Sequence, residues 1–538
     1  MNFDTNYNPY PSHRSVTYGK NGMVATSQPL AAGVGLDILK KGGNAIDAAI
    51  ATAACLTVVE PTSNGIGGDA FAIVWHKEQM YGLNASGPAP KGISIEGVKA
   101  LGHEEKMPTF GWTPVTVPGA PAAWGELSRK FGKLPLSEVL APAIKYATEG
   151  YPVSPVLGKN WQRAYDFYKE KMEGPEFGSW FETFAPFGRA PYVGELVKLP
   201  HHGKTLAEIG RTQGESFYRG QLADKIVSAS KANGGFLSQD DLANYEPTWV
   251  TPISVNYRGY DVWELPPNGQ GVVALAALNI LKSYTFEGCA NIDSAHKQIE
   301  AIKLAFTAGK ACISDPLTMD ETRVPNMLSE EFAKEGAAKI GKRALELAET
   351  PLSKGGTVYL CTADAEGNMV SYIQSNYMGF GSGIVVPETG IAMQNRGADF
   401  SLDENHANAL AGGKKTYHTI IPAFITKDKA AVGAMGVMGG YMQPQGHVQV
   451  LMNMIDFNLN PQMALDAPRF QWVKDKKIEV EQQFPHHITM ALGDMGHEMS
   501  VNLAVGAFGR GQIILKDETT GVYAGATESR CDGSVVGY

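Results

Sequence analysis

The stretch GGTVYLCTADAEGNMVS, residues 355–371, carries the most informative local pattern in this 538-residue chain. Residues 357–363 and 368–373 have the character of strands and flank the turn sequence DAEGN, which predicts a β-hairpin. Two glycines stand immediately before Thr357, the first residue of the predicted strand. The junction between Gly356 and Thr357 has two interpretations. On local sequence alone it is a loop that leads into a hairpin. The second interpretation is that its peptide bond cleaves itself.

The second interpretation rests on the chemistry of a Gly-Thr bond. Gly356 tolerates a strained backbone because it lacks a Cβ atom. The Thr357 hydroxyl can then attack the Gly356 carbonyl, and hydrolysis of the resulting ester frees a threonine whose α-amine serves as the base for its own hydroxyl. Gly439 and Gly440 precede a predicted helix, so their N–H groups are candidates for an oxyanion hole.

The rest of the chain mixes helical and strand patterns. Residues 24–60 predict two helices, with Ser27 and Asn44 as caps, and residues 69–84 predict a hairpin. Residues 161–187 are crowded with aromatic side chains, which indicates an irregular, aromatically packed subdomain or a wall that stacks on substrate. Residues 294–312 predict an amphipathic helix, and 418–425 with 430–435 predict a strand pair. The mixed order favours an α+β or layered sandwich fold.

Composition and charge exclude several classes of protein. The net charge of −9 argues against a nucleic-acid partner, and no run approaches the ~18 apolar residues of a membrane span. The first residues lack the apolar core of a secretory signal, so we expect a cytoplasmic location. The five cysteines are scattered, which is typical of free thiols, and no GxSxG or HExxH motif occurs. We expect neither a metal ion nor an organic cofactor.

Segments spread along the chain, in order, resemble the γ-glutamyltransferase family. They are ATSQPLAAGVGLDILKKGGNAIDAAIATAACLTVVEPTSNGIGGDAF (25–71), PVTVPGAPAAW (114–124), GGTVYLCTADAEGNMVS (355–371), GFGSGIVVPETGIAMQNRGADFS (379–401), MGG (438–440), ALDAPRF (464–470) and RCDGSVVGY (530–538). The resemblance implies an N-terminal nucleophile hydrolase made as a proenzyme, with a four-layer αββα sandwich. It also implies a large subunit, residues 1–356, and a small subunit, residues 357–538, that stay associated as one domain after cleavage between Gly356 and Thr357. Two such processed pairs could also associate as a dimer.

The resemblance also assigns roles to individual residues. Thr357 corresponds to the nucleophile, and Ser375 to a residue that supports it. The remaining assignments are a substrate-contacting role for Asn376 or Tyr377, ammonium binding for Asp399, and the oxyanion hole for Gly439 and Gly440.

Three departures from the family pattern concern the acyl group. The arginine that holds the α-carboxylate of a γ-glutamyl donor is missing from residues 83–88, LNASGP, and His418-Thr419 replaces a pair of serines. Arg396 stands where the family has a Glu or Gln that helps to bind the ammonium. Between Phe400 and Pro422 the chain is also shorter than in members with a lid.

We therefore expect an amidohydrolase or acyltransferase that acts on a small-molecule amide of γ-glutamyl or glutaryl type, similar to glutathione hydrolases. An arginine at position 396 would repel an ammonium, or neutralise Asp399 by pairing with it, and would attract a carboxylate, which favours glutaryl donors. The alternative is that Arg396 points away from the site and forms a structural ion pair. The alternatives are an acylase for cephalosporin or glutaryl side chains, an amidase for γ-linked polyglutamate, and a processed but inactive binding protein.

Overall fold

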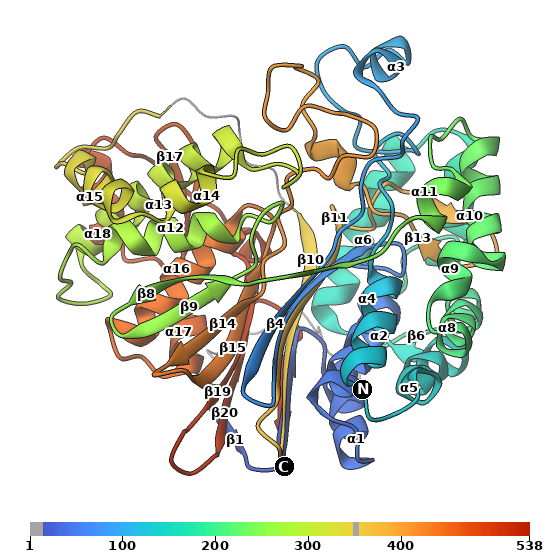
Figure 1. The fold of residues 1–538 in the computed structure, drawn as a ribbon, viewed down its shortest axis with the longest axis horizontal. Coiled ribbons are helices and arrows are strands. Elements are labelled where there is room, and N and C mark those ends of the chain that lie inside the picture. The colour runs from blue at the N-terminus through green and yellow to red at the C-terminus, as the bar shows by residue number, and fades with distance from the viewer. Residues whose placement is uncertain (1–13, 348–354) are drawn as a thin grey trace.

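Two antiparallel sheets of seven strands each form the centre of the molecule (Figure 1). The computed structural model describes residues 14–347 and 355–538. The first sheet has the order β21 (Ser534–Gly537), β2 (Gly22–Thr26), β10 (Gly356–Asp364), β11 (Met369–Tyr377), β3 (Asp69–His76), β4 (Gln79–Ala85) and β7 (Thr248–Val250). The second has the order β1 (Thr17–Gly19), β20 (Tyr523–Thr527), β19 (Arg510–Lys516), β15 (Ala430–Met438), β14 (Ala423–Lys427), β9 (Tyr260–Glu264) and β8 (Ile253–Tyr257).

The two sheets pack face to face around an apolar core. Tyr359 and Ile373 of the first sheet share this core with Phe424 and Ile514 of the second. The rings of Trp75 and Phe424 stack across the interface at a centroid distance of 5.9 Å. Strand periodicity explains the arrangement, because alternate side chains of each strand point to opposite faces of its sheet.

Helices cover the outer face of each sheet (Figure 1). On the first sheet these include α1 (Pro29–Lys40), α2 (Ala45–Val59), α4 (Ala120–Phe131) and α5 (Leu136–Glu149). On the second they include α12 (Gly271–Leu281), α13 (Ile292–Cys312) and α16 (Met442–Ile455). All fifteen residues of α2 are buried, as its small side chains predicted. None of the helices in the described part of the chain is both long and apolar enough to cross a membrane.

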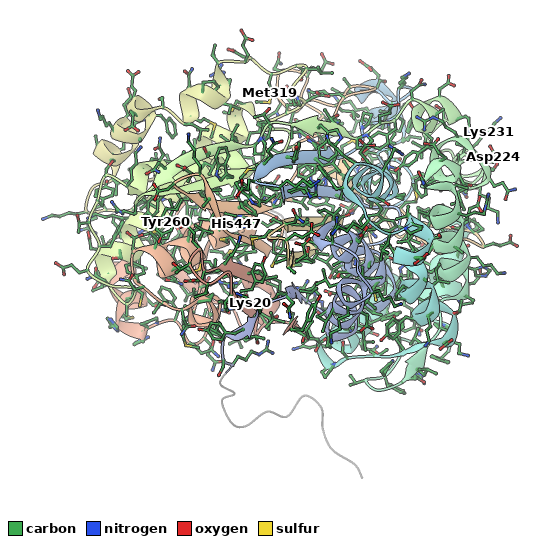
Figure 2. The ribbon with its side chains drawn as sticks, turned by 60° about the horizontal axis from the view of Figure 1, so that its bottom comes forward. Lys20, Asp224, Lys231, Tyr260, Met319 and His447 are labelled. Carbon is green, nitrogen blue, oxygen red and sulfur yellow. The ribbon has the colours of Figure 1, made fainter. Side chains whose placement is uncertain are left out.

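The helices place charged side chains at the periphery of the molecule and other side chains in its interior. Figure 2 shows Asp224 and Lys231 of α10 (Gln221–Ala232) at the periphery, whereas His447 of α16 lies in the interior. His447 accepts a hydrogen bond from the backbone N–H of Val437 at 2.9 Å, and its other ring nitrogen lies 2.7 Å from the Glu264 carboxylate. This histidine therefore fixes α16 against β15 and β9.

Three local predictions from the sequence need correction. Gln28 caps α1 in place of Ser27, whose hydroxyl donates to Glu60 instead. Residues 161–187 are not irregular, because most of them lie in α6 (Pro155–Lys171) and α7 (Gly178–Phe184), although their aromatic packing is confirmed. Strand β14 begins at Ala423 and not at residue 418, because the backbone of His418 bonds to the loop at 268–270.

Candidate active site

Thr357 lies at a β-bulge near the start of β10 and is almost completely buried. The pairing of β10 with β11 shifts register between Gly356 and Val358, so Thr357 has no cross-strand partner. The Thr357 hydroxyl donates to Ser375 Oγ at 3.0 Å, and Ser375 Oγ donates to the Gly356 carbonyl at 2.8 Å. One serine hydroxyl thus contacts both the predicted nucleophile and the carbonyl that it would attack.

The two glycines before Thr357 fit a space that no side chain could share. A Cβ atom on Gly356 would lie 2.8 Å from the backbone nitrogen of Gly379, and one on Gly355 would lie 2.9 Å from the carbonyl oxygen of Tyr377. Both neighbours are backbone atoms, which cannot move aside as the end of a flexible side chain can. The glycines are therefore required by close packing.

The turn at Gly439 and Gly440 lies directly beside this junction. Gly439 and Gly440 have φ values of 145° and 60°, which strongly favour glycine. A Cβ atom on Gly355 would lie 3.2 Å from Gly440 Cα and 3.5 Å from Gly440 N. Across the described residues, the N–H groups of both turn glycines donate to no protein acceptor. They are available for a developing oxyanion.

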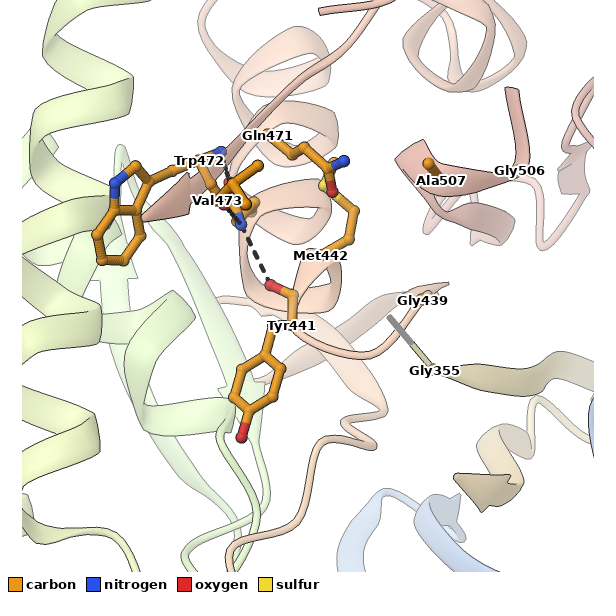
Figure 3. A pocket seen from close by; sticks show the side chains of 10 residues that line it. Gly355, Gly439, Tyr441, Met442, Gln471, Trp472, Val473, Gly506 and Ala507 are labelled. Atoms are coloured by element: carbon orange, nitrogen blue, oxygen red, sulfur yellow. Dashed lines mark hydrogen bonds between the residues drawn. The ribbon is translucent and has the colours of Figure 1, made fainter. Parts of the chain in front are cut away.

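A small cavity of about 40 Å³ opens next to the turn (Figure 3). Figure 3 shows Gly355 and Gly439 side by side at one edge, with Met442 and residues 471–473 along another. Gln445 fixes the far wall, because its side chain donates to the carbonyl of Trp472 at 3.0 Å and accepts from the N–H of Trp472 at 2.7 Å. The cavity is therefore a preformed space beside the turn at Gly439.

Asp399 is engaged by two tyrosines. Its Oδ1 atom accepts hydrogen bonds from the hydroxyl groups of Tyr377 at 2.8 Å and Tyr441 at 3.0 Å. Tyr441 follows the glycine turn directly, and Lys310 of α13 donates to its hydroxyl. The N–H of Tyr377 donates to Ser375 Oγ at 2.8 Å. Contacts of Tyr377 and Tyr441 therefore connect Asp399 to Ser375, beside Thr357, and to the turn at Gly439 and Gly440.

Arg396 is buried close to Asp399, with one side of its guanidinium group unused. Its Nη1 atom donates to Thr419 Oγ1 at 2.8 Å and lies 3.8 Å from Asp399 Oδ2, and the group stacks at 4.0 Å over the ring of Tyr377. Nε and Nη2 have no hydrogen-bond partner among the residues described, although the side chain is only 1% exposed. Burial lowers the pKa of Arg396, while the nearby Asp399 raises it. A buried cation with two unused donor atoms is a candidate site for an anion.

His418 is paired with the carboxylate of Asp69, which no sequence motif indicated. Its Nε2 atom lies 3.0 Å from Asp69 Oδ2, and both side chains are completely or almost completely buried. Burial raises the pKa of Asp69 to about 7, while Arg396 opposes this shift, and burial lowers the pKa of His418. Because the N–H of Ile420 points at His418 Nδ1, the Nε2 atom carries the proton and donates to Asp69.

The two alternatives for the substrate-contacting residue point to different places. Tyr377 faces Asp399, whereas Asn376 packs against the loop at 65–68, where a Cβ atom on Gly68 would lie 2.7 Å from Asn376 Oδ1. The residues that replace the family arginine form an uncharged network, in which Asn84 Nδ2 donates to Asn268 Oδ1 at 2.9 Å and Ser86 donates to Asn84 Oδ1. The missing positive charge is therefore not replaced at this position.

The described residues contain one group with metal-ligand geometry, and it lies elsewhere. Ligand atoms of His296, Glu300 and His497 all fall within 4.8 Å of one another. Lys303 Nζ donates to Glu300 at 2.9 Å, so an ammonium group already occupies this carboxylate. His296 is fourteen residues before Lys310 on α13, which is ~21 Å along a helix. This group is thus not part of the site around Thr357.

Most residues predicted from the sequence meet in one place. The residues of this group contact one another directly or through one neighbouring residue, and Gly439 lies beside them. The group is Thr357, Ser375, Tyr377, Arg396, Asp399, His418, Thr419 and Gly440. Four residues with contacts in this region were not predicted from the sequence: Asp69, Gln270, Lys310 and Tyr441. Tyr441 and Asp69 could have been found from the sequence, because each directly follows a glycine cluster. Tyr441 follows Gly439-Gly440, and Asp69 follows the cluster at 65–68. Lys310 carries no comparable local signal.

Comparison with known proteins gives consistent matches over nearly the full length of the chain. Residues 31–538 match the family model described as gamma-glutamyltranspeptidase. The glutathione hydrolase-like YwrD proenzyme of Bacillus subtilis is 35% identical over 96% of this chain and 99% of its own. The acylase ACY 1 proenzyme of a Pseudomonas species is 31% identical over 96% of this chain and 94% of its own.

Solved structures give the same result. The crystal structure of cephalosporin acylase from Bacillus halodurans has a TM-score of 0.97 and 59% identity, and the match covers 100% of this chain and 99% of that one. Hydrolases, acylases and proenzymes are thus the named relatives of this sequence. The chain is an enzyme that belongs to the γ-glutamyltranspeptidase family.

Proposed function

We propose that this enzyme is a self-processing threonine amidohydrolase that cleaves amides of carboxylate-bearing acyl groups such as glutaryl. Its four layers, helices on both outer faces of two packed sheets, would be the αββα sandwich of the N-terminal nucleophile type. Cleavage between Gly356 and Thr357 would give a large subunit, residues 1–356, and a small subunit, residues 357–538.

The hydrogen bonds of Ser375 support the self-cleavage step. Its hydroxyl donates to the Gly356 carbonyl and so increases the electrophilic character of the carbonyl carbon. The Thr357 oxygen attacks that carbon, the C–N bond breaks, and the nitrogen gains a proton and becomes the free α-amine of Thr357. Water then hydrolyses the ester, which leaves a carboxylate on Gly356 and restores the threonine hydroxyl.

The same groups then serve the reaction with substrate. The α-amine of Thr357 takes the hydroxyl proton as Oγ attacks the amide carbonyl, and the N–H groups of Gly439 and Gly440 stabilise the oxyanion. The proton passes to the leaving amine as the C–N bond breaks, which leaves an acyl ester on Thr357. Water attacks this ester with the α-amine as base, and the acid product is released. An amine in place of water would give acyl transfer.

The unused donor atoms of buried Arg396 are the observation that carries the choice of acyl group. A carboxylate can accept from Nε and Nη2 together, as a bidentate pair. Asp399, which an α-ammonium would need, accepts from two tyrosines at Oδ1. Its Oδ2 atom has no hydrogen-bond partner among the described residues, but the positive charge of Arg396, 3.8 Å away, would repel an ammonium there. A glutaryl group has the carboxylate and lacks the ammonium. The relationship to enzymes named as acylases supports the same choice.

Retained catalytic geometry argues against an inactive binding protein. The contacts of Thr357 with Ser375, and the free N–H groups of the turn, are those that the chemistry requires. A γ-linked polyglutamate substrate also presents carboxylates, but each donor unit carries an amide or ammonium nitrogen at its α-carbon. This nitrogen would have to lie against the guanidinium group of Arg396, which makes polyglutamate the weaker candidate.

The processing step is tested by gel electrophoresis and N-terminal sequencing. Wild type should give two bands, the smaller beginning Thr-Val-Tyr-Leu, and Thr357→Ala should give one full-length band. Gly356→Ala should slow cleavage at least tenfold, because its Cβ atom would press on the backbone of Gly379 and displace the carbonyl. Gly33→Ala is the matched control: nothing lies within 4 Å of its new Cβ atom in α1, so cleavage should proceed at the wild-type rate. Cleavage of Thr357→Ala would disprove the assignment of the nucleophile.

The acyl preference is tested with p-nitroanilides. Wild type should hydrolyse the glutaryl anilide at least as well as the γ-glutamyl anilide, as judged by kcat/KM. Arg396→Gln should lower kcat/KM for the glutaryl anilide and shift the preference toward γ-glutamyl, because the positive charge is lost while Thr419 keeps a donor. Arg396→Lys keeps the positive charge but cannot form a bidentate pair. Its kcat/KM for the glutaryl anilide should therefore lie between the values of wild type and Arg396→Gln. A strong γ-glutamyl preference that Arg396→Gln leaves unchanged would reject the proposed acyl group.

A further inference from the structure

Gln270 connects the oxyanion turn to the acyl-binding side of the site. It lies in the loop between β9 and α12, is completely buried and directly precedes α12. Its Nε2 atom donates to the carbonyl of Gly440 at 2.9 Å and to the carbonyl of Thr419 at 2.6 Å. Both hydrogens of one amide group are therefore used, each on a different wall of the site.

The remaining contacts of Gln270 fix the orientation of this amide. Its Oε1 atom accepts from the hydroxyl of Tyr417 at 3.0 Å, and its backbone N–H donates to the carbonyl of His418 at 3.0 Å. The loop is held further by the N–H of His418, which donates to the carbonyl of Asn268 at 2.8 Å. Gln270 and the segment at 416–419 thus form one hydrogen-bonded unit with no unused polar atom on the Gln270 side chain.

The contact with Gly440 matters because a glycine turn is intrinsically flexible. Gly440 has no Cβ atom to restrict its backbone, and its φ of 60° is one of several accessible conformations. An oxyanion hole stabilises the transition state only if its donors are held in place before the reaction. The hydrogen bond from Gln270 restrains the Gly440 carbonyl and so limits rotation of the backbone that carries the Gly440 N–H.

The contact with Thr419 acts on the other side of the site. Thr419 Oγ1 accepts from Arg396, the residue proposed to bind the substrate carboxylate. Because the same amide holds Thr419 and Gly440, it sets the distance between the anion-binding group and the oxyanion donors. That distance must match the length of the acyl chain.

We propose that Gln270 is a positioning residue that holds the oxyanion turn and the Arg396–Thr419 pair in a fixed mutual geometry. This inference rests on the proposed function, since it assigns Gly440 and Arg396 their parts in acyl transfer. Only an amide satisfies the site, because the two carbonyls require two hydrogens from one atom and Tyr417 requires an acceptor on the other. A carboxylate at this position would place an oxygen against two carbonyl oxygens.

The test compares Gln270→Glu and Gln270→Met with a matched buried amide. Asn279 lies in α12, and its Nδ2 atom also donates to two backbone carbonyls, those of Leu328 and Ser329, at 3.0 and 3.1 Å. Asn279→Asp therefore removes two donated hydrogen bonds, as Gln270→Glu does, without touching the site. Asn279→Leu removes two, whereas Gln270→Met removes three because the contact with Tyr417 is also lost. Self-cleavage rate, kcat, KM and the urea midpoint are measured for all four variants with the better anilide substrate.

A boronic acid that carries a terminal carboxylate provides a readout of geometry. Its boron accepts a lone pair from Thr357 Oγ as the hydroxyl proton moves to the α-amine, which gives a tetrahedral anion like the transition state. We expect Gln270→Glu to lower kcat about 10²-fold, similar to the loss of one oxyanion donor, and to weaken boronate binding by a similar factor. Gln270→Met should show a smaller loss of both. Glutarate, which lacks the tetrahedral centre, should lose less affinity than the boronate.

The outcomes separate this inference from the proposed function. Asn279 variants should lose stability while kcat and the boronate Kd stay at wild-type values. If Gln270 variants behave in the same way, with kcat and boronate affinity unchanged, the positioning role is wrong. If the Gln270 variants fail to fold, Tyr417→Phe tests the positioning role in their place. Loss of the contact between the Tyr417 hydroxyl and Gln270 Oε1 should lower kcat three- to tenfold. An unchanged kcat would reject the role. If wild type neither cleaves itself nor binds the boronate, the proposed function fails and this inference fails with it.

Discussion

Asp69 shows at the scale of one residue how burial couples the site to pH. The pKa of its carboxyl is raised to about 7, chiefly by burial, and the charged or titratable groups that act on it are His418, Arg396 and Lys415. A pKa above the unfolded value means that folding disfavours the ionised form. The contribution of Asp69 to stability is therefore complete below pH ~4 and is lost as the pH rises to about 7.

Asp69→Asn tests this effect, because an amide keeps an acceptor for the N–H of Gly119 and cannot ionise. The variant should gain stability relative to wild type between pH 4 and 7, by at most about 1.4 kcal/mol per pH unit, and the difference should level off above pH 7. Urea unfolding at several pH values measures it, in a Thr357→Ala background that keeps one uncut chain. A difference that does not change with pH would show that Asp69 is ionised throughout.

Individual site residues differ in how far the sequence could predict them. Thr357, Asp399 and the turn glycines stand in contiguous motifs, so the sequence alone is enough to propose roles for them. Gln270 acts through Thr419 and Gly440, which are 149 and 170 residues away, and Asp69 pairs with a histidine 349 residues away. Nothing local to these positions indicates such partners, because burial and hydrogen bonding arise only when the two sheets pack together.

At the scale of single elements, the clearest local signal is the cap of α2. Asn44 Oδ1 accepts from the N–H groups of Ile46 and Asp47, and Asp47 Oδ2 accepts in return from the N–H of Asn44. Asn44 Nδ2 also donates to the carbonyl of Phe131 at 2.7 Å, which ties α2 to the end of α4. This cap serves both a helix end and a tertiary contact.

Asn44→Ala should therefore lower the free energy of unfolding by more than the removal of an ordinary helix cap does. We expect a loss of about 2 kcal/mol in the free energy of unfolding, at the upper end of the range for cap removal, because the Phe131 carbonyl also loses its donor. Ser329→Ala is the control, since Ser329 caps α15 (Glu330–Lys339) and its hydroxyl donates only to the local carbonyl of Asn326. Its loss should be about 0.5–1 kcal/mol. Equal losses measured by urea unfolding would show that the contact with Phe131 adds nothing.

Sequence patterns predicted elements well where the signal was local and poorly where tertiary contacts decide. The hairpin at β3 and β4 and the cap by Asn44 follow from periodicity and side-chain chemistry, and both are confirmed. Ser27 is a good cap by type, but the Glu60 carboxylate takes its hydroxyl. The segment at 418–422 is apolar enough for a strand, yet the loop that contains Gln270 takes the backbone hydrogen bonds of His418. In both cases a distant partner competes with the local preference.

At the scale of the whole molecule, the chain segments on either side of Gly356–Thr357 are interleaved. In the first sheet, β2 lies between β21 and β10, and β3 follows β11, so strands from both sides of the junction alternate. In the second sheet, β1 and β9 border the strands of the C-terminal part at both ends. Arg510 and Glu60, one from each side, form a buried ion pair at 3.1 Å. Cutting one bond removes none of these contacts.

The interleaving predicts that cleavage leaves the two subunits inseparable under native conditions. Processed wild type and uncut Thr357→Ala should elute at the same volume in size-exclusion chromatography, with both wild-type bands in one peak. The peak should persist in 1 M salt, where the Debye length is about 3 Å, because backbone ladders and apolar packing hold the interface and screened surface charges do not. Separation should require a denaturant that unfolds the sheets. Elution of the small subunit in a separate native peak would mean that these strand pairings do not survive cleavage.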